Sequence, residues 1–114
     1  MNEIEINHAW KEMLHHLFDV VNGVQDGREI REKAFEDAER WARELTKLLK
    51  GSEMLPRAFL HKLDMAAGIL ENEASHSPDE RRVLAMSRAV RYTLGLILWG
   101  QCHDDYKPGV PRAR

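Results

Sequence analysis

Apolar residues recur along most of this chain at alternating spacings of four and three, and no other feature constrains its fold as much. The first run extends from Ile6 to Val24. These spacings place the side chains on one stripe of a helix with about 3.6 residues per turn. Three further runs repeat the pattern later in the chain. We therefore expect an all-α fold, with helices at about residues 4–21, 28–50, 55–75 and 78–101.

Turn and capping residues separate the four runs. A cluster of turn-forming residues at 22–27 predicts a short loop, and Gly51 is typical of a helix stop. Pro56 suits the first turn of the third helix, where its missing N–H has no partner to lose. Ser77 and Glu80 have the spacing of a capping box, which predicts Ser77 as the N-cap of the fourth helix.

Chain length and short connections together predict the architecture. A chain of 114 residues has room for one hydrophobic core. Four helices of about 20 residues with short links favour an antiparallel up-down four-helix bundle over residues 1–101. Residues 102–114 contain two prolines and a glycine, so we expect a short, irregular, flexible C-terminal tail.

Composition excludes several classes of protein. Apolar residues make up 43% and charged residues 32%, so the chain can bury a core and is not compositionally disordered. No apolar run approaches the roughly 20 residues of a membrane span. Residues 1–10 lack the pattern of a signal peptide and Cys102 is the single cysteine, which together indicate a cytoplasmic protein.

Charge makes nucleic acid an unfavoured partner. The chain has 17 basic and 19 acidic residues, so it lacks the basic bias of a protein that coats nucleic acid. A weak association through a local patch is the second alternative function, and acidic neighbours dilute that patch. Its basic residues are Arg81, Arg82, Arg88, Arg91, Arg112 and Arg114.

Two Glu-x-x-His pairs have the spacing that di-iron helical bundles use for metal ligands, namely Glu12 with His15 and Glu73 with His76. The first pair lies opposite the apolar stripe and points to solvent, and no inward carboxylates complete a site.

Residues 102–104 combine Cys, His and Asp, but consecutive residues cannot line up as nucleophile, base and orienting acid. We therefore expect no metal, no cofactor and no catalytic residue.

The segment His61-Lys62-Leu63-Asp64-Met65-Ala66-Ala67-Gly68 resembles the phosphoacceptor segment of histidine phosphotransfer domains, which are also helical bundles. The resemblance implies His61 as an outward-facing phosphoacceptor in a signalling protein, which is the first alternative function. That family has a lysine and a glycine where this chain has Asp64 and Met65. An acid adds like-charge repulsion beside a phosphohistidine, and a methionine obstructs docking of a receiver domain.

An apolar surplus on the outer sides of the last two helices predicts a binding surface, because interface cores are enriched in aromatic residues, Met and Arg. The alternative is that the tail or an irregular bundle geometry buries this face within the monomer. We expect a non-enzymatic regulatory or inhibitory protein, such as an inhibitor, immunity-type protein, adaptor or phage-encoded regulator. Its partner is another protein or a second copy of the chain. The surface residues are Arg88, Tyr92, Leu96 and Trp99 on the fourth helix, with Met65 and Ile69 on the third.

Overall fold

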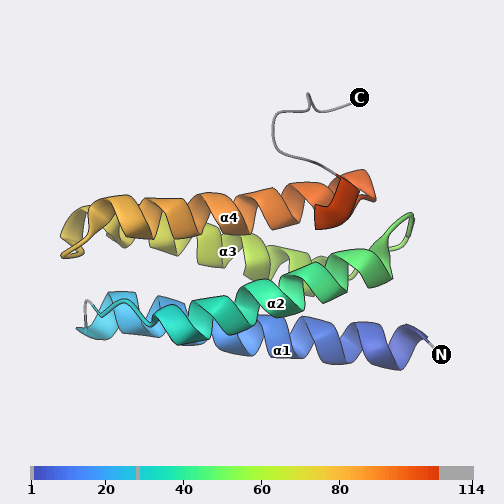
Figure 1. The fold of residues 1–114 in the computed structure, drawn as a ribbon, viewed down its shortest axis with the longest axis horizontal. Coiled ribbons are helices and arrows are strands. Elements are labelled where there is room, and N and C mark those ends of the chain that lie inside the picture. The colour runs from blue at the N-terminus through green and yellow to red at the C-terminus, as the bar shows by residue number, and fades with distance from the viewer. Residues whose placement is uncertain (1, 28, 106–114) are drawn as a thin grey trace.

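The chain forms an all-α four-helix bundle, as the apolar periodicity predicts (Figure 1). The computed structural model describes residues 2–27 and 29–105. No strand occurs in these two ranges. The helices are α1 (Asn2–Asn22), α2 (Glu32–Leu49), α3 (Arg57–Glu73) and α4 (Glu80–Trp99), with short helical turns at Gly23–Gly27, Ala74–His76 and His103–Asp105.

The bundle consists of two helical hairpins packed on each other. Helix α1 pairs with α2 and α3 pairs with α4, and consecutive helices run antiparallel (Figure 1). Between the hairpins α1 lies beside α3 and α2 lies beside α4, so that each of these two contacts joins parallel helices. We call these contacts the α1/α3 seam and the α2/α4 seam.

The predicted apolar stripes form one hydrophobic core. Burial of each large apolar side chain contributes about 1.5–3 kcal/mol relative to exposure. All four helices supply such residues, so the core depends on both hairpins. Its largest fully buried side chains include Trp10, Met13, Leu17, Leu45, Leu63, Leu70, Met86 and Ile97.

The link between α1 and α2 differs from the predicted loop, because α2 begins at Glu32 and not at residue 28. The chain leaves α1 through the turn at Gly23–Gly27, where the Glu29 N–H donates to the Gly23 carbonyl at 2.9 Å. Arg31 then bridges Asp19 on α1 and Glu29. A Cβ atom on Gly23 would lie 2.9 Å from Arg31 Nε and 3.0 Å from the Glu29 carbonyl oxygen, so a larger residue there would have to displace the Arg31 side chain.

The predicted N-cap of α4 is wrong by two residues. Asp79 is the N-cap, and its carboxylate accepts the Arg82 N–H at 3.1 Å. The Ser77 hydroxyl instead accepts the Asp79 N–H at 3.2 Å, which shapes the preceding turn. Because Asp caps a helix as well as Ser does, the residue closer to the helix takes the role.

Helix α4 ends two residues earlier than its apolar pattern predicts. Gly100 adopts a left-handed conformation with φ of 70°, which L side chains rarely tolerate. The Gly100 N–H donates to Ile97 and the Gln101 N–H to Leu96, which is a Schellman motif. The Gly51 N–H donates to the Gly100 carbonyl at 3.2 Å, so the α2–α3 loop contacts this end.

Candidate functional site

The outer surface of α4 lacks one of its predicted apolar residues but exposes a further apolar residue, Leu98, at 60%. Arg88 is exposed, and Tyr92 and Trp99 are 41% and 53% exposed, but Leu96 is fully buried. The prediction for Leu96 is wrong because the chain reverses at Gly100 and returns along this side of the helix. A helical wheel drawn for α4 alone does not include that returning segment.

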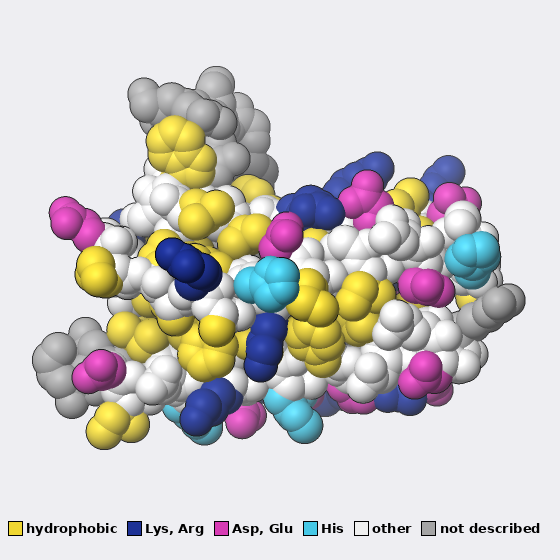
Figure 2. All heavy atoms as spheres, turned by 180° about the vertical axis from the view of Figure 1, so that it is seen from behind, with side chains coloured by type: hydrophobic (Ala, Val, Ile, Leu, Met, Phe, Trp, Pro, Cys, Tyr) yellow, Lys and Arg dark blue, Asp and Glu magenta, His cyan; other side chains and the backbone are white. Residues whose placement is uncertain are grey.

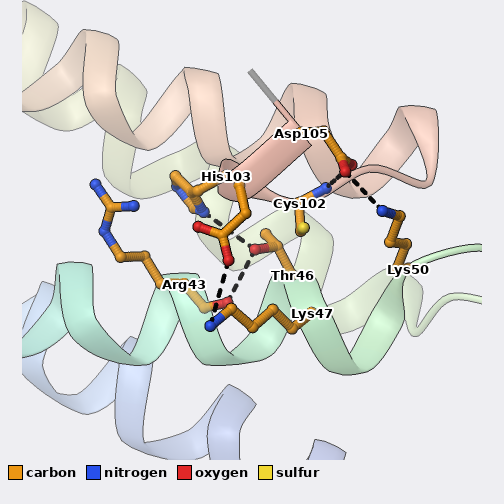
Figure 3. A network of polar contacts seen from close by, with 8 residues as sticks. Arg43, Thr46, Lys47, Lys50, Cys102, His103 and Asp105 are labelled. Atoms are coloured by element: carbon orange, nitrogen blue, oxygen red, sulfur yellow. Dashed lines mark hydrogen bonds and ion pairs between the residues drawn. The ribbon is translucent and has the colours of Figure 1, made fainter. Parts of the chain in front are cut away.

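The returning segment, residues 102–105, is a docked turn and not the start of a flexible tail. Its anchor is His103, which lies between α2 and α4 (Figure 3). The His103 Nδ1 atom lies 3.0 Å from the Thr46 hydroxyl and the Nε2 atom 3.3 Å from the Thr93 hydroxyl. The Cys102 side chain is buried beneath the turn. Residues 106–114 of the predicted tail lie outside the described residues.

The hydrogen bonds define the state of the His103 ring. The Thr46 hydroxyl donates to the Arg43 carbonyl at 3.1 Å, so its oxygen is the acceptor for an N–H of His103 at Nδ1. In the neutral form of this ring, Nε2 is then the acceptor for the Thr93 hydroxyl. Burial lowers the pKa of His103, and the nearby positive charge of Arg43 lowers this pKa further.

Two ion pairs hold the rest of the docked turn on α2. Lys47 lies 3.4 Å from the Asp104 carboxylate, and Lys50 lies 2.6 Å from the Asp105 carboxylate. The hydrogen bond from Lys50 lowers the pKa of Asp105, whose other oxygen accepts the Cys102 N–H at 2.8 Å. These contacts close one end of the α2/α4 seam.

An apolar groove lies along the α1/α3 seam, on the other side of the bundle. Figure 2 shows hydrophobic side chains along the boundary between these helices, with histidine and cationic side chains among them. Met65 is 43% exposed, and Ile69, one turn later on α3, is partly buried against the core. The groove is lined by Phe18, Ala58, His61, Lys62 and Met65.

The residues predicted to form one interface therefore lie on two separate surfaces. Met65 lines the groove beside α1, whereas the Tyr92 ring packs edge-on against His103 near α2, with centroids 5.8 Å apart. Phe18 was not predicted as a site residue, because it lies just outside the stripe that includes Leu17. The signal for this residue in the sequence was an aromatic side chain immediately beside an apolar stripe.

His61 lies at the groove and is exposed, as its wheel position predicts. Asp64, three residues later, turns away and pairs with Arg91 on α4 at 3.4 Å. The groove-lining neighbours of His61 on α3 are Ala58, Lys62 and the partly exposed Met65. Phosphotransfer at His61 stays a prediction.

The predicted basic patch on α4 is partly neutralised within the bundle. Arg82 makes two hydrogen bonds to Glu32 on α2, at 2.7 and 2.8 Å. Arg91 pairs with Glu71 at 2.9 Å, in addition to its contact with Asp64. These contacts use half of the arginines predicted on α4, and nucleic-acid binding stays a prediction.

Glu12, whose spacing to His15 resembles that of a metal-ligand pair, forms an ion pair with His16 at 3.7 Å. Across residues 2–27 and 29–105 no group of three His, Cys, Asp or Glu side chains is arranged to hold a metal ion. Within the same ranges no helix is long and apolar enough to cross a membrane.

No known protein family, curated protein or solved structure matches this chain.

Proposed function

We propose that this chain is a non-enzymatic regulatory protein that binds another protein through the α1/α3 groove. The observation that carries this proposal is the partly exposed Met65 beside Phe18 in a groove with largely apolar lining. Contiguous exposed apolar surface marks binding sites, and methionine adapts its shape to a partner. An inhibitor or adaptor requires only such a surface and no reacting groups.

The groove is a better candidate than the outer face of α4. Leu96, which would be central to an α4 interface, is buried, and the docked turn already occupies the side next to α2. Tyr92 and Trp99 therefore flank a segment of the chain itself. A cytoplasmic location belongs to the same proposal and is supported by the single cysteine, which is a free buried thiol.

The test replaces one methionine in the groove and one outside it. Met65→Glu places a charge among the apolar lining residues and should abolish capture of the partner in the cells that produce the chain. Met54→Glu is the matched control, because Met54 is 89% exposed on the loop between α2 and α3. Both variants should keep the helicity of the wild type. Equal capture by wild type and Met65→Glu would rule out the groove.

A second candidate function is phosphotransfer at His61, favoured by the exposure of this side chain beside the cationic Lys62. A nearby cation stabilises the charge of a phosphoryl group. Incubation with labelled acetyl phosphate should label the wild type and not His61→Ala. Absence of label, or equal label on both proteins, excludes this function.

A further inference from the structure

The acidic side chains in the middle of α1 form ion pairs with residues that do not line the groove. Glu12 pairs with His16 on its own helix, and Asp19 pairs with Arg31, at the entry to α2. The Asp19 carboxylate is therefore used on the α1–α2 side of the bundle, and the Glu12 carboxylate is used within α1.

The same division holds on α3. Asp64 and Glu71 both pair with Arg91 of α4, across the contact within the second hairpin. Glu73 is the remaining acid of α3, and it is the last residue of the helix, beyond Ile69. The stretch of α3 that lines the groove thus presents no carboxylate of its own to the groove.

Cations remain on the groove side of both helices. On α3, Lys62 lines the groove. On α1, Lys11 lies seven residues before Phe18, on the same side of that helix. Neither of these two lysines forms an ion pair with any residue that the structure describes. The groove therefore has an apolar floor with the two lysines at its rim.

The shape of the groove matches a helix. It runs between two parallel helices, and from Ala58 to Met65 it extends roughly 10 Å at about 1.5 Å per residue. That length accommodates about two turns of an added helix, whose apolar residues at spacings of three and four would meet Phe18 and Met65.

We propose that the α1/α3 groove binds an acidic amphipathic α-helix of a partner protein. This inference rests on the proposed function and adds the chemistry of the partner. The apolar face of the helix contacts Phe18, Ala58 and Met65, and its flanking carboxylates pair with Lys62 and Lys11. Charge complementarity of this kind steers association and fixes the register of the helix.

A second copy of the chain is a poorer occupant. In a symmetric dimer the same patch meets itself, so the cations of one rim would face the cations of the other. Like charges placed together across an interface oppose association. Nucleic acid is also a poor match, because its phosphates would lie over an apolar floor.

The experiment selects helical peptides of about 14 residues from a displayed library on the wild-type protein, with counter-selection on Met65→Glu. The library fixes apolar residues at positions i, i+3 and i+7 and randomises the flanks. The selected peptides should be rich in Asp and Glu. Their affinity should fall at least tenfold between about 50 mM and about 500 mM salt, because rim charges are screened.

Charge reversal on the rim supplies the matched comparison. Lys62→Glu should weaken the selected acidic peptides about fivefold or more, as expected for a rim ion pair near partly buried groups. Arg81→Glu, which removes the same charge from an exposed position on α4, should leave their affinity unchanged. A selection repeated on Lys62→Glu should yield less acidic peptides.

The outcomes separate this inference from the proposed function. Neutral or basic selected peptides, or unchanged affinity for Lys62→Glu, would overturn the acidic helix, even where capture of a cellular partner still depends on Met65. A dimer that Met65→Glu dissociates in light scattering would overturn it in favour of a second copy. Loss of both peptide selection and Met65-dependent capture would remove the groove as a binding site altogether.

Discussion

The two seams between the hairpins join parallel helices in the same bundle, but they are closed in different ways. Polar contacts cross the α2/α4 seam, where Arg82 on α4 binds Glu32 and also lies over the Phe35 ring at 5.2 Å. Further along, His103 connects Thr46 to Thr93.

The α1/α3 seam is closed by apolar contact. The Trp10 and Phe59 rings meet with centroids 5.3 Å apart, and no ion pair joins α1 to α3 in the described part of the chain. The indole N–H of Trp10 is buried and donates to no atom there. Beyond these rings the apolar side chains continue to the surface at Phe18 and Met65.

This difference separates a seam closed by polar contacts from the seam at which we propose that a partner binds. Directional hydrogen bonds and ion pairs hold α2, α4 and the docked turn in one arrangement, which uses the polar groups available there. Apolar surface that is exposed to solvent gains favourable free energy when a partner buries it. We therefore expect substitutions beneath the groove to lower the unfolding free energy most. Substitutions at the polar seam should have moderate effects, and substitutions on the surface of the groove should have small ones.

The largest effect should come from the residue beneath the groove. Leu63, 1% exposed on α3, should lose about 2–5 kcal/mol of unfolding free energy on replacement by Ala, because a cavity forms in the core. Met65→Ala, two residues along the same helix, should cost less than about 1 kcal/mol. Urea unfolding followed by circular dichroism measures both. Equal losses would show that Met65 belongs to the core.

The polar seam should respond to loss of a hydroxyl. Thr46 is fully buried, and Thr46→Val keeps its shape but leaves His103 Nδ1 without its acceptor. An unsatisfied buried donor costs about 1–3 kcal/mol. Thr46→Ser, which retains the hydroxyl, should recover most of this loss. If Val and Ser have the same unfolding free energy, the His103 contact does not stabilise the seam.

The same histidine should make stability depend on pH. Because burial lowers the pKa of His103 in the folded state, the unfolded chain takes up the proton more readily. Its contribution is complete above about pH 6.5 and is lost as the pH falls from there toward the folded-state pKa. Unfolding of wild type and His103→Gln at several pH values measures this. Parallel pH profiles for the two proteins would contradict the prediction.

The smallest effect should come from the exposed pair that crosses the polar seam. Arg82 and Glu32 form a bidentate contact, but both side chains are partly exposed, so a double-mutant cycle with Arg82→Met and Glu32→Gln should give about 0.2–1 kcal/mol. This coupling should shrink in high salt. Lys62→Met, on the rim of the groove, should leave stability within about 0.5 kcal/mol of wild type. A coupling that salt does not change would argue against a screened surface pair.

Local patterns predicted more of the fold than of the site. The existence of all four helices could be read from the spacing of residues such as Trp10, Leu17 and Leu63. The ends were less predictable, as Asp79 in place of Ser77 shows, because adjacent residues compete for one capping position. For the candidate site, the exposure of His61 and Met65 followed from the helical wheel, but their neighbour Phe18 did not.

The sequence by itself determined four amphipathic helices, because helical periodicity depends only on residues within a few positions of one another. Tertiary structure alone decided which helices are neighbours, and that order placed Met65 beside Phe18 and away from Tyr92. It also decided that the chain returns after Gly100 and places His103 on Thr46, a contact across 57 positions. Such contacts depend on how whole faces pack together, which no single helix encodes.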